Sequence, residues 1–339
     1  MQFVHKAIIL YLYEIFYRNV GTKFMNLRNL KGSLILLSAA VIWGLAFVAQ
    51  DEAAKYIEPF TVNAMRSYIG GFALIIVSAV MSKIKKRPLL PKTPADRKRL
   101  AFTGVVCGIL LCIAVNFQQF GIAAYPAHTA ASARSGFLTA MYILFVPLFG
   151  IFLKKRPGIT VFIAVIIAVL GLYLLCFSNG IGAVYGGDLI VLICAVAFTF
   201  HILCVDTLGQ KVDGVKLSCI QFFVCAILST VLMLCFEEPT AGDILKAGMP
   251  LLFLGVMSSG VAYTLQIIGQ QQCENPTVAS IVMSFESVFA ALGGALFGDV
   301  LSKKEMLGCA VMFAAIIISQ LPSPKLKKNQ KKHGSCFMG

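Results

Sequence analysis

Ten long apolar runs constrain this chain more than any other feature of its sequence. A helix needs about 20 mostly apolar residues to cross the roughly 30 Å hydrocarbon core of a bilayer. Lipid offers the backbone no hydrogen-bond partner, so each run must satisfy its own backbone as a helix. The runs are also continuous, whereas the strands of a membrane barrel alternate. We therefore expect an all-α integral membrane protein with ten transmembrane helices. These helices are expected at 33–50, 60–82, 100–122, 127–153, 159–177, 187–207, 215–236, 248–271, 276–298 and 304–320.

The composition excludes a soluble protein. Of the 339 residues, 58% are hydrophobic and only 13% are charged, and the mean hydropathy is +0.85. A soluble domain of this size would carry about twice that share of charged residues. A soluble enzyme and a nucleic-acid-binding protein are therefore both disfavoured.

The basic residues predict the orientation of the chain. If the N-terminus lies inside, most of the 29 lysines and arginines fall on the inner side, eight of them in the loop 83–99. The outer loops carry acidic residues instead, among them Asp51, Glu237 and Asp243. Because cytoplasmic loops are enriched in Lys and Arg, we expect both termini in the cytoplasm of a cell-membrane protein. The net charge of +14 then reflects this orientation, and no nucleic-acid partner is needed to explain it.

Residues 1–31 precede the first apolar run and are expected to form a cytoplasmic or interfacial leader. The apolar stretch 3–17 is short and contains Lys6 and Glu14, and no A-x-A cleavage site follows it, which disfavours a signal peptide. Two interpretations stay open. The stretch forms an interfacial helix, or the translated chain starts at Met25.

The chain carries an internal repeat. A shift of 155 residues places the first two expected helices on the sixth and seventh without a gap, and Asp51 then meets Asp206. A shift of 148 places the third and fourth on the eighth and ninth, and Gln118 then meets Gln266. We expect one repeat at 32–177, a second at 187–320 and a basic tail at 321–339. Five helices is an odd number, so the second repeat enters the membrane inverted, an arrangement typical of transporters with alternating access.

Four segments resemble the EamA-type transporters of the drug/metabolite transporter superfamily. They are AAVIWGLAFVAQ at 39–50, VNAMRSYIGG at 62–71, and the longer stretches 117–150 and 262–302. The resemblance implies ten helices, no cofactor and a central cavity lined by the first four helices and by the sixth to ninth. It also implies amino acids, other small metabolites or cationic drugs as exported substrates. One departure is that Ser287 follows Glu286, where the family often has a proline that would favour a kink.

Three charged residues fall inside expected membrane helices, where a charge costs several kcal/mol and marks a candidate site. Arg66 either snorkels to the outer headgroups or attracts an anionic group in a cavity. Arg134 either joins helices or holds a substrate carboxylate through a bidentate guanidinium. Glu286 near the middle of the ninth helix is a candidate for coupling to protons. A buried carboxyl without a partner favours its neutral form, and one paired with arginine keeps its charge.

Polar side chains at helical spacing complete the expected substrate site. In the fourth helix, Ser135, Thr139 and Tyr142 lie on one stripe that Arg134 borders. The alternative role of all these polar groups is to hold helices together. Trp43, the only tryptophan, is a candidate cavity wall. The remaining candidates are Asn116 and Gln119 in the third helix, and Tyr263, Gln266 and Gln270 in the eighth.

The sequence predicts a secondary active transporter that exports a small polar metabolite such as an amino acid. It contains no ATPase, metalloprotease or nucleophile-elbow motif, so we expect transport that runs on a gradient. Its partners would be the bilayer, a small-molecule solute and, as a coupling ion, protons; the oligomeric state stays open. Two alternatives remain. One is a membrane acyltransferase that uses the HxxxxD spacing of His201 and Asp206, and the other is a transporter of cationic drugs or amines.

Overall fold

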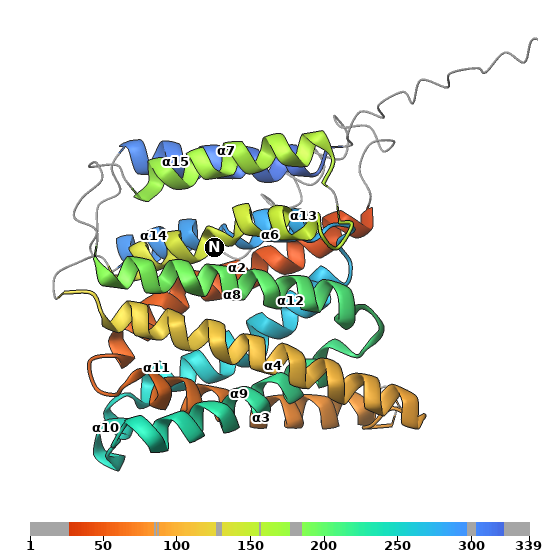
Figure 1. Ribbon diagram of the computed structural model, residues 1–339, viewed down its shortest axis with the longest axis vertical. Coiled ribbons are helices and arrows are strands. Elements are labelled where there is room, and N and C mark those ends of the chain that lie inside the picture. Colours follow the sequence, from red (N-terminus) through yellow and green to blue (C-terminus); the bar gives the residue numbers. More distant parts are fainter. Residues whose placement is uncertain are drawn as a thin grey trace, which may run out of the picture.

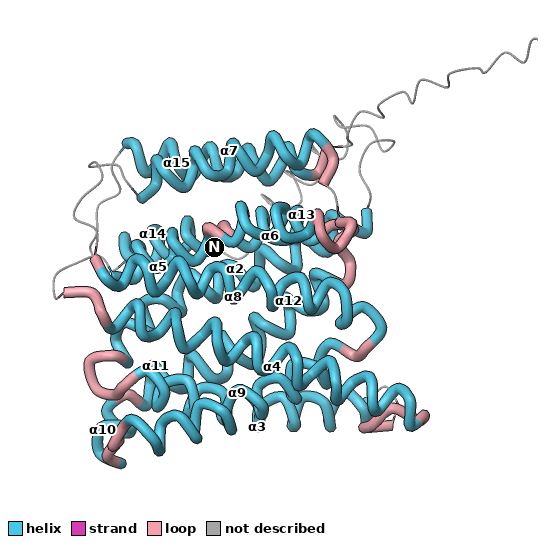
Figure 2. Tube along the Cα trace, in the orientation of Figure 1, coloured by secondary structure: helices cyan, strands magenta, loops and turns pink. Residues whose placement is uncertain are grey.

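The structure is a computed structural model of the chain, and every regular element in its described part is helical (Figures 1 and 2). The described residues are 27–84, 86, 88–126, 131–155, 157–176, 185–296 and 303–321. The expected leader and the tail therefore lie almost wholly outside them. The helices of the first half are α2 (Leu27–Ala53), α3 (Pro59–Ile84), α4 (Pro94–Ala123), α5 (Ala131–Ala140), α6 (Tyr142–Gly150) and α7 (Ile159–Cys176). Those of the second half are α8 (Gly186–Leu208), η1 (Gly209–Lys211), α9 (Gly214–Phe236), α10 (Ala241–Lys246), α11 (Gly248–Phe253), η2 (Leu254–Ala262), α12 (Tyr263–Gln270), α13 (Pro276–Met283), α14 (Glu286–Leu296) and α15 (Lys303–Ser319).

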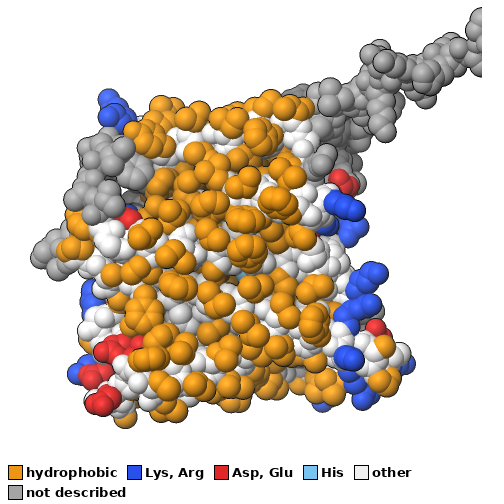
Figure 3. Space-filling model, in the orientation of Figure 1, with side chains coloured by type: hydrophobic (Ala, Val, Ile, Leu, Met, Phe, Trp, Pro, Cys, Tyr) orange, Lys and Arg blue, Asp and Glu red, His pale blue; other side chains and the backbone are white. Residues whose placement is uncertain are grey.

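The helices have the length and surface of membrane spans. Within the described residues, seven helical segments are long and apolar enough to cross a bilayer, and three shorter apolar segments accompany them, at Arg134–Gly150, Ile159–Leu174 and Met306–Ser319. Figure 3 shows a broad apolar belt on the viewed face, with charged side chains gathered at two opposite rims. A soluble protein would not expose an apolar area of this extent.

Local sequence signals start several of these helices. Thr93 accepts a hydrogen bond from the backbone N–H of Asp96, and Pro94 takes the first turn of α4, where its missing N–H costs nothing. Asp213 caps α9 through the N–H groups of Val215 and Lys216. The loops before these helices thereby satisfy backbone donors that lipid would leave unpaired.

The apolar runs expected at 127–153, 248–271 and 276–298 are not single regular helices. The first divides between α5 and α6 at Met141, and the second passes through the π-helix η2. The third breaks between α13 and α14, although no proline follows Glu286. The hydroxyls of Ser284 and Ser287 donate to backbone oxygens three residues earlier, at 2.8 and 2.7 Å. Serines that bond back to the helix backbone in this way bend helices, so here they accompany the break that a proline would otherwise favour.

Packing places α7 and α15 together in an outer layer and brings the other helices around a common centre (Figure 1). Helix α3 packs on α9, α4 packs on α8 and α9, and α2 packs on α12, α14 and η2. Glycines allow the closest crossings. A Cβ added to Gly187 of α8 would lie 2.7 Å from the backbone oxygen of Gly121 of α4, and one added to Gly32 of α2 would lie 2.9 Å from that of Gly269 of α12.

Candidate functional site

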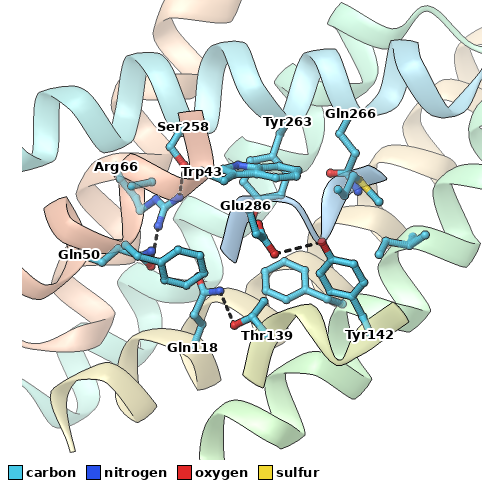
Figure 4. A pocket seen from close by; sticks show the side chains of 15 residues that line it. Trp43, Gln50, Arg66, Gln118, Thr139, Tyr142, Ser258, Tyr263, Gln266 and Glu286 are labelled. Atoms are coloured by element: carbon cyan, nitrogen blue, oxygen red, sulfur yellow. Dashed lines mark hydrogen bonds between the residues drawn. The ribbon is translucent and has the colours of Figure 1, made fainter. Parts of the chain in front are cut away.

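A cavity lies at the centre of the helices, and both halves of the chain line it (Figure 4). It leaves about 30 Å³ for the centre of a water molecule, room for roughly two waters. A larger solute would therefore require the helices to move apart. The lining residues are Trp43, Ala46, Phe47, Gln50, Arg66, Gln118, Thr139, Tyr142, Phe198, Ile202, Ser258, Tyr263, Gln266, Met283 and Glu286.

Arg66 of α3 is buried in this cavity wall, with 2% of its surface exposed. Its guanidinium donates to Gln50 Oε1 at 3.2 Å, Ser258 Oγ at 2.9 Å and Ser259 Oγ at 3.2 Å. All three acceptors are neutral, and within the described residues no acidic side chain forms an ion pair with Arg66. A buried charge normally carries a counter-charge. Arg66 therefore presents an uncompensated positive charge at the cavity.

The π-helix η2 explains how two consecutive serines reach one guanidinium. Ser258 and Ser259 both lie within η2, and such helices occur often at functional sites. The backbones of η2 and α3 also approach closely. A Cβ added to Gly70 of α3 would lie 2.9 Å from the backbone oxygen of Gly255 of η2. This close approach keeps both hydroxyls within reach of Arg66.

Glu286 starts α14 at the break in its helix and is 4% exposed. Its Oε1 accepts a hydrogen bond from the hydroxyl of Tyr142 at 3.0 Å (Figure 4). No ion pair joins Glu286 to Arg66 in the described part of the chain, although both line the cavity. The site thus holds one basic and one acidic side chain that do not form an ion pair with each other.

Aromatic rings, and polar atoms without a hydrogen-bond partner among the described residues, line the cavity together with Arg66 and Glu286. The rings of Trp43 and Tyr263 meet edge to face at 4.8 Å. Gln118 donates to Thr139 at 3.1 Å. Trp43 Nε1 and Gln266 Oε1 are buried without a hydrogen-bond partner in the described structure. Buried polar atoms are nearly always satisfied in proteins, so these two are open to a ligand.

The structure brings seven of the expected site residues together and places five elsewhere. Those that line the cavity are Trp43, Arg66, Thr139, Tyr142, Tyr263, Gln266 and Glu286. Those outside the lining are Asn116, Gln119, Arg134, Ser135 and Gln270. Asn116 donates to Ser229 of α9, Gln119 donates to the backbone of Gln50, and Gln270 donates to the backbone of Ile202. These three amides hold helices together, which is the alternative role that the sequence left open.

Arg134 belongs to a separate cluster. Its Nε and Nη2 atoms lie 2.5 and 2.6 Å from the two carboxylate oxygens of Asp188, in a bidentate ion pair between α5 and α8. The hydroxyl of Tyr125 also donates to Asp188 at 2.8 Å, and the guanidinium lies 4.9 Å from the ring centre of Tyr185. The carboxylate that faces Arg134 is therefore one of the protein's own, that of Asp188.

Sequence reasoning missed several lining residues that a helical wheel and the repeat would have found. Ala46, Phe47 and Gln50 follow Trp43 at spacings of three, four and seven, which is one helix face. Gln118 is the repeat counterpart of Gln266. Phe198, Ile202, Ser258 and Met283 also line the cavity. The signal was absent only for Ser258, because the sequence does not reveal the π-helix that turns it inward.

His201 and Asp206 do not form one catalytic unit. His201 contacts Gln221 Oε1 at 3.2 Å, whereas Asp206 forms an ion pair with Lys155 at 3.1 Å. In the part of the chain that the structure describes, no group of three His, Cys, Asp or Glu side chains is placed to hold a metal ion. The geometry offers no support for the acyltransferase alternative.

Comparison with known proteins identifies the family. The EamA-like transporter family matches residues 30–177 and again residues 185–321. The chain is 26% identical to the uncharacterized transporter YwfM of Bacillus subtilis over 311 residues, 89% of this chain and 98% of that protein. It is 25% identical to an uncharacterized transporter of Archaeoglobus fulgidus over 303 residues, 87% of this chain and 88% of that protein.

The fold also matches a solved structure. A crystal structure described only as that of a protein superposes with a TM-score of 0.66 at 17% identity, covering 85% of this chain and 96% of that one. Identity this low supports the fold alone. The two family matches cover most of the chain and confirm the resemblance seen in the sequence. The chain belongs to the EamA-like transporter family, whose members are membrane transporters and not enzymes.

Proposed function

We propose that this chain is a secondary active transporter that moves a small polar solute through the central cavity by alternating access. Its ten membrane helices would be two inverted five-helix repeats, at 32–177 and 187–320. The seven long and three shorter apolar segments support this count. The packing supports the inversion, because the largest contacts between helices have counterparts when the halves are exchanged. The packing of α4 on α8, for example, corresponds to that of α12 on α2.

Residues that are equivalent in the two repeats line the cavity together, which supports a pseudo-twofold axis that passes through the cavity. Under the 155-residue shift Trp43 corresponds to Phe198 and Phe47 to Ile202, and all four residues line the cavity. Under the 148-residue shift Gln118 corresponds to Gln266, and both again line it. In transporters with inverted repeats, the substrate binds at such an interface between the repeats.

The proposed solute is a small amino acid. The observation that carries this choice is that Arg66 and Glu286 line one cavity without forming an ion pair with each other. Arg66 would receive the carboxylate through a charge-assisted hydrogen bond, and Glu286 would receive the ammonium group. Trp43 Nε1 and Gln266 Oε1 offer further polar contacts. The small volume favours a short side chain and requires the helices to separate during binding.

The proposed orientation has both termini in the cytoplasm, with Arg28, Lys31, Lys83 and Lys155 at inner helix ends. The positive-inside rule supports it. Export would be driven by the gradients of the solute and of protons, with Glu286 as the group that exchanges a proton for the ammonium. The same carboxyl cannot hold both cations at once, which would couple the two movements.

An organic cation is the second candidate solute. The observation that favours it is that Glu286 shares a cavity with the rings of Trp43, Tyr142 and Tyr263. Aromatic faces and a carboxylate together suit amines and quaternary ammonium groups. A cation of this kind would leave Arg66 without a role.

Counterflow in proteoliposomes tests the proposal. Vesicles loaded with each of the 20 amino acids or with a set of amines would be placed in medium containing a trace of the labelled form. We expect one small amino acid to exchange well above empty vesicles, and R66A to abolish that exchange. Exchange of amines alone, unaffected by R66A, would favour the cation. No exchange of any tested amino acid or amine would refute both candidates.

A further inference from the structure

The repeat places one acid–base pair of residues at two opposite ends of the molecule. The 155-residue shift brings Asp51 onto Asp206. The 148-residue shift brings LFGIFLKK at 148–155 onto LFGDVLSK at 296–303, and therefore Lys155 onto Lys303. Each half of the chain thus supplies one aspartate and one lysine of equivalent position.

The pair at the proposed inner end is formed. Lys155 Nζ lies 3.1 Å from Asp206 Oδ2, and the aspartate side chain is 3% exposed. The backbone directs the lysine there. Lys154 adopts a left-handed conformation with φ of 59°, and the N–H of Lys155 bonds back to the oxygen of Gly150 at 2.9 Å, which closes the end of α6. The ion pair joins the end of α6 to the end of α8.

The equivalent pair at the outer end is open. Lys303 at the start of α15 is exposed. Asp51 near the end of α2 is half-buried, and no ion pair or hydrogen bond holds its carboxylate in the described part of the chain. The two halves therefore differ in this contact, although the charges at the equivalent positions match.

Other equivalent contacts are formed at both ends. The crossing of Gly121 with Gly187 corresponds to that of Gly269 with Gly32, and the two crossings are similarly close, at 2.7 and 2.9 Å from an added Cβ to the facing backbone oxygen. Contacts that are formed in both halves can persist through a transport cycle. A contact that is formed in one half only must break in that half, and form in the other, when the two halves exchange conformations.

We propose that Lys155–Asp206 and Lys303–Asp51 are alternative ion pairs that close the inner and the outer side in turn. This inference rests on the proposed alternating access. In this structure the inner pair is closed. When it breaks, α6 separates from α8, and by symmetry the start of α15 approaches the end of α2, where Lys303 meets Asp51.

Zero-length crosslinking of the purified protein tests this exchange directly. A water-soluble carbodiimide joins a lysine amine to a carboxylate with loss of water only where the two are in contact, and peptide mass spectrometry locates the bond. The wild type should give the Lys155–Asp206 crosslink. In D206N the Lys303–Asp51 crosslink should rise about fivefold, the upper range for a single partly exposed ion pair. K155D/D206K, which restores the inner pair with reversed charges, should suppress it again.

Two exposed pairs serve as internal controls, because Lys55–Glu52 and Lys246–Asp243 should react equally in every variant. Failure of Lys303–Asp51 to rise in D206N while both controls react would overturn the proposal, as would a rise that K155D/D206K does not reverse. The test is independent of flux. Exchange of the crosslinks in a protein that transports nothing in proteoliposomes would uphold the switch and refute the proposed transport.

Discussion

The hydroxyl of Tyr142 donates a 3.0 Å hydrogen bond to the carboxylate of Glu286, although 144 positions separate the two residues. The contact joins the two family repeats across the cavity. Both of its residues lie at a break in a membrane segment. Tyr142 begins α6, and Glu286 begins α14. Breaks in membrane helices free backbone and side chains to line a site, and they are typical of the binding regions of transporters.

This contact leads to a prediction for Glu286. E286Q keeps the size and the hydrogen bond from Tyr142 but removes the charge, so we expect solute exchange to fall at least about tenfold while the protein stays folded, the effect of losing one charge-assisted contact. Y142F, the matched control, removes only the hydroxyl and should reduce exchange about threefold to tenfold. Counterflow rates together with melting curves check both. Exchange by E286Q at the wild-type rate would exclude Glu286 from the site.

Ser258 and Ser259 should affect solute binding indirectly, because they position Arg66. Their hydroxyls hold the guanidinium without neutralising it. We expect S258A/S259A to raise the half-saturation concentration for a carboxylate-bearing solute about fivefold to 150-fold, because each lost hydrogen bond costs about 0.5–1.5 kcal/mol. The maximal rate should change little. S218A, another buried serine but outside the cavity lining, is the control. An equal effect from S218A would show that general destabilisation is the cause.

The Arg134–Asp188 pair should act on stability and not on solute choice. Its side chains are 22% and 12% exposed, and the bond is bidentate. We expect D188N to lower the free energy of unfolding by about 1–3 kcal/mol, the range for a hydrogen bond to a charged group. The order of preference among solutes should stay as in the wild type. Breaking the exposed Lys246–Asp243 pair with K246A should leave the melting temperature unchanged. A changed order of solutes in D188N would return Arg134 to the binding site.

The glycine crossings should tolerate no methyl group. In G187A the new Cβ would lie 2.7 Å from the backbone oxygen of Gly121, which cannot rotate away. We expect a loss of about 1–3 kcal/mol or failure to accumulate in the membrane, as for other overpacked positions. G248A is the control because nothing lies within 4 Å of its added Cβ. Equal melting temperatures for G187A and the wild type would show that the helices cross less closely than described.

The fold was predictable from the sequence to the extent that length and hydropathy determine it. Apolar runs located the membrane-length helices because a helix that spans lipid requires mainly a sufficient length of apolar residues. They could not locate the breaks at Met141 and at η2, because an apolar run is uniform and the break depends on neighbouring helices. The break before Glu286 had a local sign in Ser284 and Ser287, which the comparison with a family proline obscured.

The site was predictable where a residue was costly in lipid. Arg66 and Glu286 were identified from charge alone, and both line the cavity. Arg134 carried the same signal but lies elsewhere, because its partner Asp188 belongs to the other repeat, and sequence spacing does not reveal that contact. The polar amides were ambiguous for a related reason. The spacing of polar residues along one helix face shows that they point away from lipid. It does not show whether they line a cavity or contact a neighbouring helix.

In the proposed site, Arg66 holds a carboxylate and Glu286 holds an ammonium group within one cavity. Calorimetric titration of the purified protein with the exchanged amino acid and with its decarboxylated amine, in the wild type and in R66A, tests it most directly. We expect the wild type to bind the amino acid at least about tenfold more tightly than the amine, and R66A to remove this difference while its affinity for the amine is unchanged. Equal binding of both compounds by the wild type, or a preference for the amino acid that survives in R66A, would contradict it.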